Sequence, residues 1–267
     1  MAGHTRPKRS LGQNFLVDPN IRRRIVEEVR AEPHHQVLEI GPGKGALTEG
    51  LAARPGPLIL VELDRELAAS LRERFAGADN VTVVEGDILH LPLADLVDDP
   101  GGLHVVGNIP YNVTTPILFH LLKPPRPLEI VLMVQREVAD RILAEVSTRQ
   151  YGALSVGVRA VAEVERLLQV PSGAFRPRPR VESTVIRIRP IDPSPLGPHE
   201  EESLRRLTRA LFQWRRKQLG KILRDHPELR LDPAEVETLL DAAKVEVRDR
   251  PETISPRGFR AMARILR

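Results

Sequence analysis

The first half of the chain alternates short apolar runs with segments of helical periodicity. Runs rich in Val, Ile and Leu predict buried strands at residues 36–40, 58–61, 81–84, 103–106 and 130–134. Between them, apolar residues at helical spacing predict helices at residues 19–30, 65–75 and about 115–122, and a shorter one ending near residue 51. Strands that alternate with helices favour a doubly wound α/β sheet with parallel crossovers.

The pattern changes in the second half of the chain. Residues 185–189 predict one more strand, and residues 190–198 hold four prolines without a long apolar run, which indicates a linker. Residues 200–267 carry apolar positions at helical spacing, among them Leu204, Leu207 and Leu211. We therefore expect an α/β domain over residues 1–190 and a small helical domain over residues 191–267.

Charge and composition narrow the range of partners. The net charge is only +4, but residues 205–224 hold eight Arg or Lys and no Asp or Glu. Such a strip is typical of a surface that meets a polyanion, or of a solvated helix face. There is no cysteine, and the eight histidines show no paired ligand spacing, so we expect no metal site.

The sequence shows neither a signal peptide nor a membrane-spanning segment, and the cellular compartment is predicted from this. The basic, polar start of the chain does not resemble a signal peptide, and the longest wholly apolar run, residues 130–134, is far too short for a membrane span. We expect a cytoplasmic protein, and nothing in the sequence demands more than a monomer.

Glycines and carboxylates follow three of the predicted strands. GPGKG at residues 41–45 separates a strand from a helix, where Gly41 and Gly43 let the backbone approach a ligand. Glu62 ends the second strand and suits ribose hydroxyls, and Asp87 ends the third and suits an exocyclic adenine amine. Taken singly, Glu62 could be a surface carboxylate and Asp87 a helix cap. The glycine loop could belong to a nicotinamide-binding site, although its third glycine comes one residue too early for the dinucleotide-binding pattern G-x-G-x-x-G. Together they predict a cofactor site at the carboxyl edge of the sheet.

The segment NIPY follows the fourth predicted strand directly. The side-chain oxygen of Asn108 and a backbone carbonyl in the turn that contains Pro110 can accept both N–H bonds of a planar amine. That arrangement favours a tetrahedral nitrogen as it attacks a methyl sulfonium, and the ring of Tyr111 can stack on a flipped-out base. An ordinary turn after a strand is the alternative. The position after the glycine and acidic elements favours catalysis by Asn108, Pro110 and Tyr111.

These motifs together resemble those of the ribosomal RNA adenine N6-dimethyltransferases. LGQNFL at residues 11–16 is similar to the family's N-terminal motif, EIGPGKGALT at residues 39–48 to its glycine loop, and NIPY to its catalytic tetrapeptide. The resemblance runs along nearly the whole chain and implies a Rossmann-like class I methyltransferase sheet with S-adenosylmethionine as cofactor. It also implies cofactor contacts from Asn14, Leu16 and Asn108.

A proline-rich segment carries another part of the resemblance. FRPRPRVES at residues 175–183 is similar to the family's F-x-P-x-P-x-V-x-S motif, which implies that Phe175 stacks on the target base opposite Tyr111. The alternative for Phe175 is a loop anchor packed on the core. The neighbouring arginines are expected to hold phosphates that flank the base: Arg176, Arg178 and Arg180.

The basic strip contains the R-R-K-x-L core of the same family. RNA contacts are expected from Arg215, Arg216, Lys217 and Lys221, with residues 191–267 docking RNA or the ribosome and residues 1–190 carrying the cofactor and the chemistry. There is one departure from the family's pattern. Gly220 and Lys221 stand where an asparagine is expected, which bears on how the helical domain packs or docks.

Within the family, the resemblance is closest to the bacterial members that dimethylate two adjacent adenines of small-subunit ribosomal RNA during ribosome biogenesis. It therefore implies that activity and the small subunit or its precursor as partner. The large-subunit dimethylase of macrolide resistance shares NIPY and F-x-P-x-P, although Pro42 and the TTP at residues 114–116 favour the small-subunit activity. A non-catalytic ribosome-assembly or transcription factor is a second alternative, against which the intact site residues count. An enzyme acting on DNA adenine or a protein amide is the third.

Overall fold

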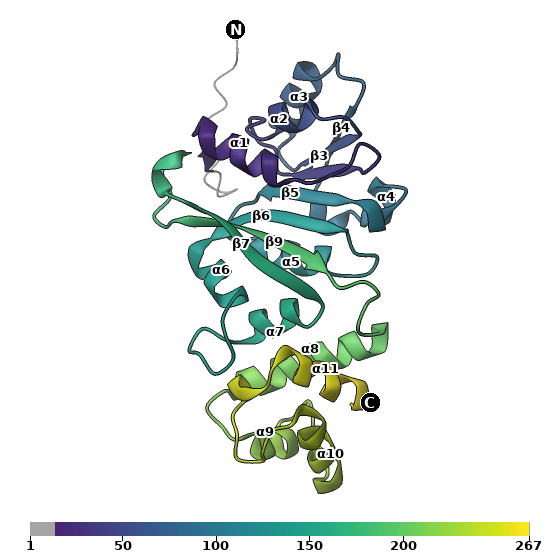
Figure 1. Ribbon diagram of the computed structural model, residues 1–267, viewed down its shortest axis with the longest axis vertical. Coiled ribbons are helices and arrows are strands. Elements are labelled where there is room, and N and C mark those ends of the chain that lie inside the picture. The colour runs from purple at the N-terminus through teal and green to yellow at the C-terminus, as the bar shows by residue number, and fades with distance from the viewer. Residues whose placement is uncertain (1–13, 267) are drawn as a thin grey trace. The chain divides into compact units, whose positions relative to one another are not determined.

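A computed structural model describes residues 14–266 and contains a seven-stranded mixed sheet. Its strands lie in the order β4-β3-β2-β5-β6-β9-β7 (Figure 1). Strands β4, β3, β2, β5 and β6 run parallel to one another, and β9 is antiparallel to β6. The expected α/β class with parallel crossovers is confirmed. The strand bounds are β2 Val37–Ile40, β3 Leu58–Glu62, β4 Val81–Glu85, β5 His104–Asn108, β6 Glu129–Gln135, β7 Ala162–Val170 and β9 Ser183–Pro190.

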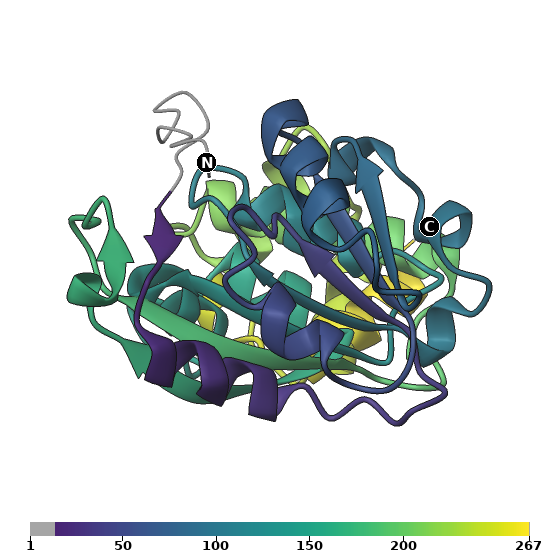
Figure 2. The same cartoon turned by 90° about the horizontal axis from the view of Figure 1, so that it is seen from above.

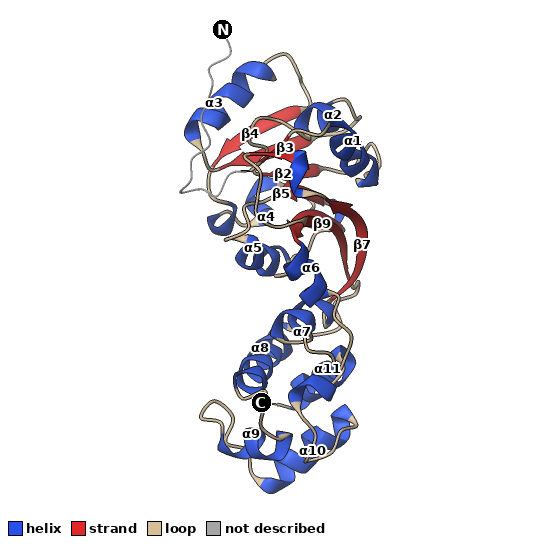
Figure 3. Ribbon diagram, turned by 90° about the vertical axis from the view of Figure 1, so that its left-hand side faces the viewer, coloured by secondary structure: helices blue, strands red, loops and turns tan. Residues whose placement is uncertain are grey.

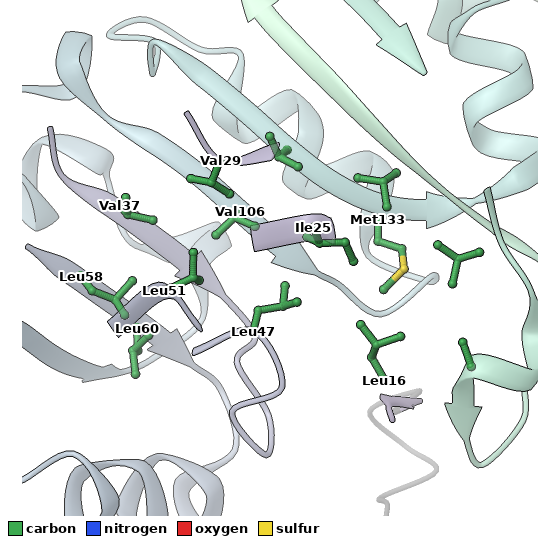
Figure 4. Packing of buried hydrophobic residues seen from close by; sticks show 14 of the residues in the cluster. Leu16, Ile25, Val29, Val37, Leu47, Leu51, Leu58, Leu60, Val106 and Met133 are labelled. Carbon is green, nitrogen blue, oxygen red and sulfur yellow. The ribbon is translucent and has the colours of Figure 1, made fainter. Parts of the chain in front are cut away.

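Helices cover both faces of this sheet, as Figure 3 shows for α1 and α2 on one face and α4 and α5 on the other. Ile25 of α1 and Leu51 of α2 pack with Val106 and Met133 of the sheet in one buried cluster (Figure 4). Leu71 of α3 belongs to the same cluster. Burying these apolar side chains is the main force that holds the layers together. The helix bounds are α1 Pro19–Glu28, α2 Thr48–Ala52, α3 Arg65–Arg74, α4 Leu93–Leu96 and α5 Thr114–Leu121.

Two short strands that the sequence pattern does not predict join distant parts of the chain. β1 (Phe15–Leu16) pairs antiparallel with β8 (Phe175–Arg176), and the two lie side by side in Figure 2. Val17 extends the pairing by donating its N–H to the Ala174 carbonyl at 2.8 Å. Leu16 and Phe175 are both buried in the core cluster. The N-terminal motif and the proline-rich segment are therefore held together by backbone pairing and by apolar packing.

A buried arginine forms ion pairs with residues of α1, β6 and β7. Arg187 of β9 is 2% exposed, and its guanidinium lies 3.0 Å from Glu129 of β6, 2.6 Å from Glu165 of β7 and 2.7 Å from Glu28 of α1. The hydrogen bond from Arg187 holds the pKa of the Glu165 carboxyl below its usual value. Glu165 of β7 thus has a charged partner within the sheet.

The helical part of the chain forms a second unit, which contains Asp140–Val164 and the residues from Pro190 onward. Tyr151 is fully buried there, and its hydroxyl donates to the Ile254 carbonyl at 2.7 Å. Its ring meets Phe212 edge-on, and Phe212 stacks on Phe259. These contacts explain why residues 140–164, which the sequence analysis assigned to the first domain, belong to the helical unit. The helix bounds are α6 Arg136–Ile142, α7 Ala153–Arg159, α8 Pro198–Gln213, α9 Leu219–Asp225, α10 Pro233–Ala243 and α11 Pro256–Ile265.

The glycine that departs from the family's pattern lies in a crowded place. A Cβ on Gly220 would stand 2.3 Å from Cγ2 of Val247, and the Gly220 N–H donates to the Val247 carbonyl at 2.9 Å. A larger residue at this position would force α9 away from the segment that contains Val247. Across residues 14–266, the helices are all too short or too polar to cross a bilayer.

Candidate active site

A cavity lies at the carboxyl ends of β2, β3, β4 and β5, which the strand order brings side by side. Most of the predicted cofactor and catalytic residues line it. These are Asn14, Leu16, Gly41, Gly43, Glu62, Asp87, Asn108, Pro110 and Tyr111. Residues 11–13 of the N-terminal motif lie outside the described part of the chain.

The glycine loop that follows β2 is shaped for close approach of a ligand. Gly41 and Gly43 have φ values of +63° and +59°, a region that side-chain-bearing residues rarely adopt. A Cβ on Gly41 would meet no protein atom within 4 Å, so the missing side chain leaves open space beside the loop. A Cβ on Gly43 would lie 3.2 Å from the ring of Phe15. The positive φ values disfavour larger residues at both positions, and the Phe15 ring also crowds Gly43.

Glu62 is held rigidly at the end of β3. Its side chain is buried and accepts the Gly43 N–H at 2.9 Å and the Asp64 N–H at 2.8 Å. Burial raises the pKa of the Glu62 carboxyl, and these two backbone hydrogen bonds oppose the rise. Each carboxylate oxygen still has a lone pair for a further donor. The geometry therefore suits a pair of ribose hydroxyls.

Asp87 caps a short helical turn at the edge of the cavity. Its Oδ1 accepts the Leu89 N–H at 3.0 Å and caps the short 3₁₀ turn Ile88–His90, while Oδ2 lies 3.3 Å from Nδ1 of His90. The same side chain also lines the cavity. A capping contact thus orients a carboxylate that remains available to a ligand amine.

Glu39 is a cavity residue that the sequence analysis did not single out. It is only 2% exposed, and its Oε2 accepts the Thr48 hydroxyl at 2.6 Å. Burial, with a smaller contribution from the charge of Glu62, raises the pKa of Glu39 to about 8. The carboxyl is therefore largely protonated at neutral pH. A charged residue inside the apolar run at residues 37–40 was the signal for an unusual environment.

The side-chain amide of Asn108 is oriented by the N-terminal motif. Its Nδ2 donates to the Asn14 carbonyl at 3.3 Å. A carbonyl can only accept, so the amide nitrogen has to face Asn14, and the Asn108 Oδ1 is left to accept from another donor. The end of β5 therefore presents a hydrogen-bond acceptor at the cavity.

The turn after Asn108 is held by its own hydrogen bonds. The Pro110 carbonyl accepts the Val113 N–H at 3.2 Å and the Thr114 hydroxyl at 3.3 Å. Because Pro110 stabilises the turn in this way, the carbonyl of the buried Ile109 is the better candidate for a second acceptor. Both residues line the cavity.

Two aromatic side chains line the cavity. The hydroxyl of Tyr111 lies 2.7 Å from Oγ of Ser183, and burial raises the pKa of Tyr111 while this hydrogen bond partly offsets the rise. Phe15 is the second, with the Lys44 ammonium 4.8 Å from its ring centroid. The sequence analysis noted Phe15 only as part of a motif.

Phe175 differs from its predicted placement. Its side chain is fully buried in the core cluster and is not among the residues that line the cavity. The pairing of β1 with β8 places it beside Leu16. This geometry supports the loop-anchor alternative over a base-stacking role.

The arginines next to Phe175 are exposed. Arg176 donates to the Phe175 carbonyl at 2.9 Å, and Arg178 donates to the Ser172 hydroxyl at 2.9 Å. Arg180 is also exposed. All three are accessible to phosphates.

Some residues of the basic strip make side-chain contacts within the helical unit, and others are exposed to solvent. Arg215 donates to the carbonyls of Arg149 and Thr148 at 2.9 and 3.0 Å, so part of its guanidinium is already engaged within the helical unit. Lys221 pairs with Asp225 at 2.8 Å within α9. The remaining two predicted RNA ligands of the strip, Arg216 and Lys217, are exposed.

The chain is similar to known proteins along nearly its whole length. The family model "Ribosomal RNA adenine dimethylase" matches residues 4–254. A protein from Acidobacterium capsulatum named "Ribosomal RNA small subunit methyltransferase A" is 43% identical over 267 residues, which cover 100% of this chain and 93% of that protein.

Two solved structures share the fold. A dimethyladenosine transferase from Plasmodium falciparum superposes with a TM-score of 0.78 at 25% identity, covering 93% of this chain and 95% of the other. The 23S rRNA methyltransferase ErmE superposes with a TM-score of 0.71 at 30% identity, covering 95% and 99%. Within residues 14–266, no cluster of three or more His, Asp or Glu side chains is arranged to hold a metal ion.

The family match covers residues 4–254, a span that includes the glycine loop, Glu62, Asp87 and the NIPY segment. The fold is that of a class I methyltransferase, and S-adenosylmethionine is the cofactor of such an enzyme. On this evidence the chain belongs to the ribosomal RNA adenine dimethylase family.

Proposed function

We propose that this protein transfers methyl groups from S-adenosylmethionine to the N6 amine of two adjacent adenines in small-subunit ribosomal RNA during ribosome biogenesis. The observation that carries the proposal is the Asn108 amide, whose nitrogen is engaged by Asn14 so that its oxygen can accept from an amine at the cavity. The name of the Acidobacterium capsulatum relative supports the small subunit as substrate.

The cofactor would be held by groups at the ends of β2, β3 and β4. Glu62 would accept hydrogen bonds from the ribose hydroxyls of the cofactor, and Asp87 would accept one from its adenine amine. The open space beside Gly41 would hold the remainder of the cofactor. Asn14 and Leu16 would close the cavity from the N-terminal side. When bound, S-adenosylmethionine supplies an electrophilic methyl group on a sulfonium.

The protein's part in the chemistry would be to prepare the amine. An adenine amine is a poor nucleophile because its lone pair is delocalised into the ring. Acceptance of its two N–H bonds by the Asn108 oxygen and the Ile109 carbonyl would favour the tetrahedral nitrogen of the transition state. Stacking on Tyr111 would hold the flipped base, an interaction worth roughly 1–3 kcal/mol. The protein would also have to align the amine with the methyl group of the cofactor.

RNA would be positioned by exposed basic residues. Arg176 ends β8, Arg178 and Arg180 follow it in the chain, and Arg216 and Lys217 are exposed on the helical unit. Contacts of this kind set register and affinity without reading sequence. We expect the partner to be the small ribosomal subunit or its precursor, bound by a monomer in the cytoplasm, where that substrate is found.

The direct test is transfer of labelled methyl groups to three substrates in parallel. These are small subunits that lack the modification, large subunits, and double-stranded DNA. We expect label in two adjacent adenines of the small-subunit RNA, mapped by mass spectrometry. Label in large-subunit RNA instead would indicate the activity named for ErmE. A protein that binds the cofactor and labels none of them would contradict the proposal and indicate a non-catalytic factor.

A further inference from the structure

The hydroxyl of Tyr111 is tied to a residue that does not itself reach the cavity. Ser183 is fully buried at the start of β9, and its Oγ lies 2.7 Å from the Tyr111 hydroxyl. Tyr111 lines the cavity and Ser183 does not. Any influence of Ser183 on a bound base therefore has to pass through the tyrosine.

The position of Ser183 is fixed by the sheet. It is paired with Gln135, the last residue of β6, in the antiparallel ladder. Next to it, the Arg136 N–H donates to the Glu182 carbonyl at 3.0 Å, and the Arg136 guanidinium lies 2.7 Å from the Glu182 carboxylate. A hydroxyl on such a strand end is a rigid anchor.

The tyrosine ring is consequently held at both ends. Its backbone follows Pro110, whose carbonyl accepts two hydrogen bonds within the turn. Its hydroxyl, at the far end of the ring, is bonded to Ser183. With both ends restrained, the ring loses the freedom to rotate away, and its face is the part left to meet a base.

We propose that Ser183 is a positioning residue that holds the ring of Tyr111 in the orientation needed to capture the target adenine. The inference rests on the proposed function, because it assumes that Tyr111 stacks on a base. It also gives a role to the serine that ends the F-x-P-x-P-x-V-x-S segment. That serine links the proline-rich segment to the NIPY turn across the end of the sheet.

The test is a double-mutant cycle on methyl transfer to small subunits, with Ser183→Ala, Tyr111→Phe and both together. Each single variant removes one partner of the same hydrogen bond, so we expect each to lower kcat/KM for the small subunit about fivefold. The double variant should lose no more than either single variant, since the shared bond is already gone. Ser183→Thr keeps a hydroxyl and should recover most of the activity. The affinity for S-adenosylmethionine, measured by calorimetry, should stay at the parental value in all four.

Thr184 provides the matched control. It is the next residue of β9, it is equally buried, and its hydroxyl has no hydrogen-bond partner within the described structure. Thr184→Val should therefore leave kcat/KM unchanged. If it lowered kcat/KM as much as Ser183→Ala does, the loss would reflect the strand and not the Tyr111 contact, and the inference would be overturned.

The outcomes separate this inference from the function on which it rests. If the parental protein transfers methyl groups but Ser183→Ala has no effect, or the two single effects multiply in the double variant, Ser183 does not act through Tyr111 and the function stands. If the parental protein transfers no methyl groups to small subunits, the proposed function is wrong, and so is the role of Ser183 that depends on it.

Discussion

The Glu39 carboxyl should lower the free energy of unfolding as pH rises, and replacing Glu39 with glutamine should abolish this effect. Glu39 is 2% exposed on β2, accepts a hydrogen bond from Thr48, and has a pKa raised by burial from 4.5 to about 8. Glutamine has nearly the same shape, can keep the hydrogen bond from Thr48, and carries no charge at any pH. The substitution therefore isolates the cost of ionising a buried acid.

The sign and the magnitude follow from the difference between the folded and unfolded proteins. The folded protein keeps a proton that the unfolded chain releases above pH 4.5, so the contribution of Glu39 is complete below pH 4.5 and is lost as pH rises through about 8. The loss is about 1.4 kcal/mol per pH unit and on the order of 5 kcal/mol in total. About 2 kcal/mol of this falls between pH 6 and pH 8.

The assay is denaturant unfolding of the cofactor-free protein followed by far-ultraviolet circular dichroism, at pH values from 5 to 8. The Glu39→Gln variant should match the parental protein within about 1 kcal/mol near pH 5 and should be more stable by about 4 kcal/mol at pH 8. Glu73→Gln, an exposed change on α3, should follow the parental curve and serves as the control. Parallel loss of stability in Glu39→Gln and the parental protein between pH 6 and pH 8 would refute the reasoning.

Three further changes test the cofactor site, the core and the RNA surface. Glu62→Ala should weaken S-adenosylmethionine binding by about 2–3 kcal/mol, because charge-assisted hydrogen bonds are lost; calorimetry showing unchanged affinity in the folded variant would remove Glu62 from the site. Phe175→Ala should lower the free energy of unfolding by about 3–5 kcal/mol, because the buried ring leaves a cavity. A Phe175→Ala variant of parental stability with slower methyl transfer would restore the base-stacking role. Charge reversal at Arg216 and Lys217 should weaken binding of small subunits and flatten its salt dependence at constant cofactor affinity; an unaltered salt slope would assign the pair a structural role.

The cofactor cavity was predictable because its residues sit at strand ends. Once strands are recognised, parallel order brings the glycine loop, Glu62, Asp87 and Asn108 to one edge of the sheet, wherever they stand in the sequence. The orientation of the Asn108 amide was not predictable, since it depends on a backbone carbonyl at Asn14, 94 residues away.

The position of Phe175 could not be read from local pattern. An aromatic residue in a proline-rich segment is compatible with an exposed stacking platform and with a buried anchor. What decides between them is the pairing of β1 with β8, which joins residues far apart in the sequence and places Phe175 against Leu16. Two-residue strands leave no periodic signal.

The tertiary contacts of charged residues could not be predicted from the sequence in two other places. β7 contains Glu163, Glu165 and Arg166, which obscure a strand pattern, yet Glu165 is paired with the buried Arg187. Arg215 resembles Arg216 in sequence, but its guanidinium is bonded to backbone carbonyls of residues 148 and 149. Composition records a charge, whereas only tertiary structure shows whether that charge is already engaged.

The most direct test of the central claim is single-turnover methyl transfer by the Asn108→Ala variant, with cofactor and small subunits at saturating concentrations. An acceptor that acts on the amine as it becomes tetrahedral strengthens toward the transition state, so its loss should slow transfer while binding changes little. The account predicts a rate about a hundredfold below the parental value, with cofactor and subunit affinities close to those of the parental protein. Transfer at the parental rate would contradict it.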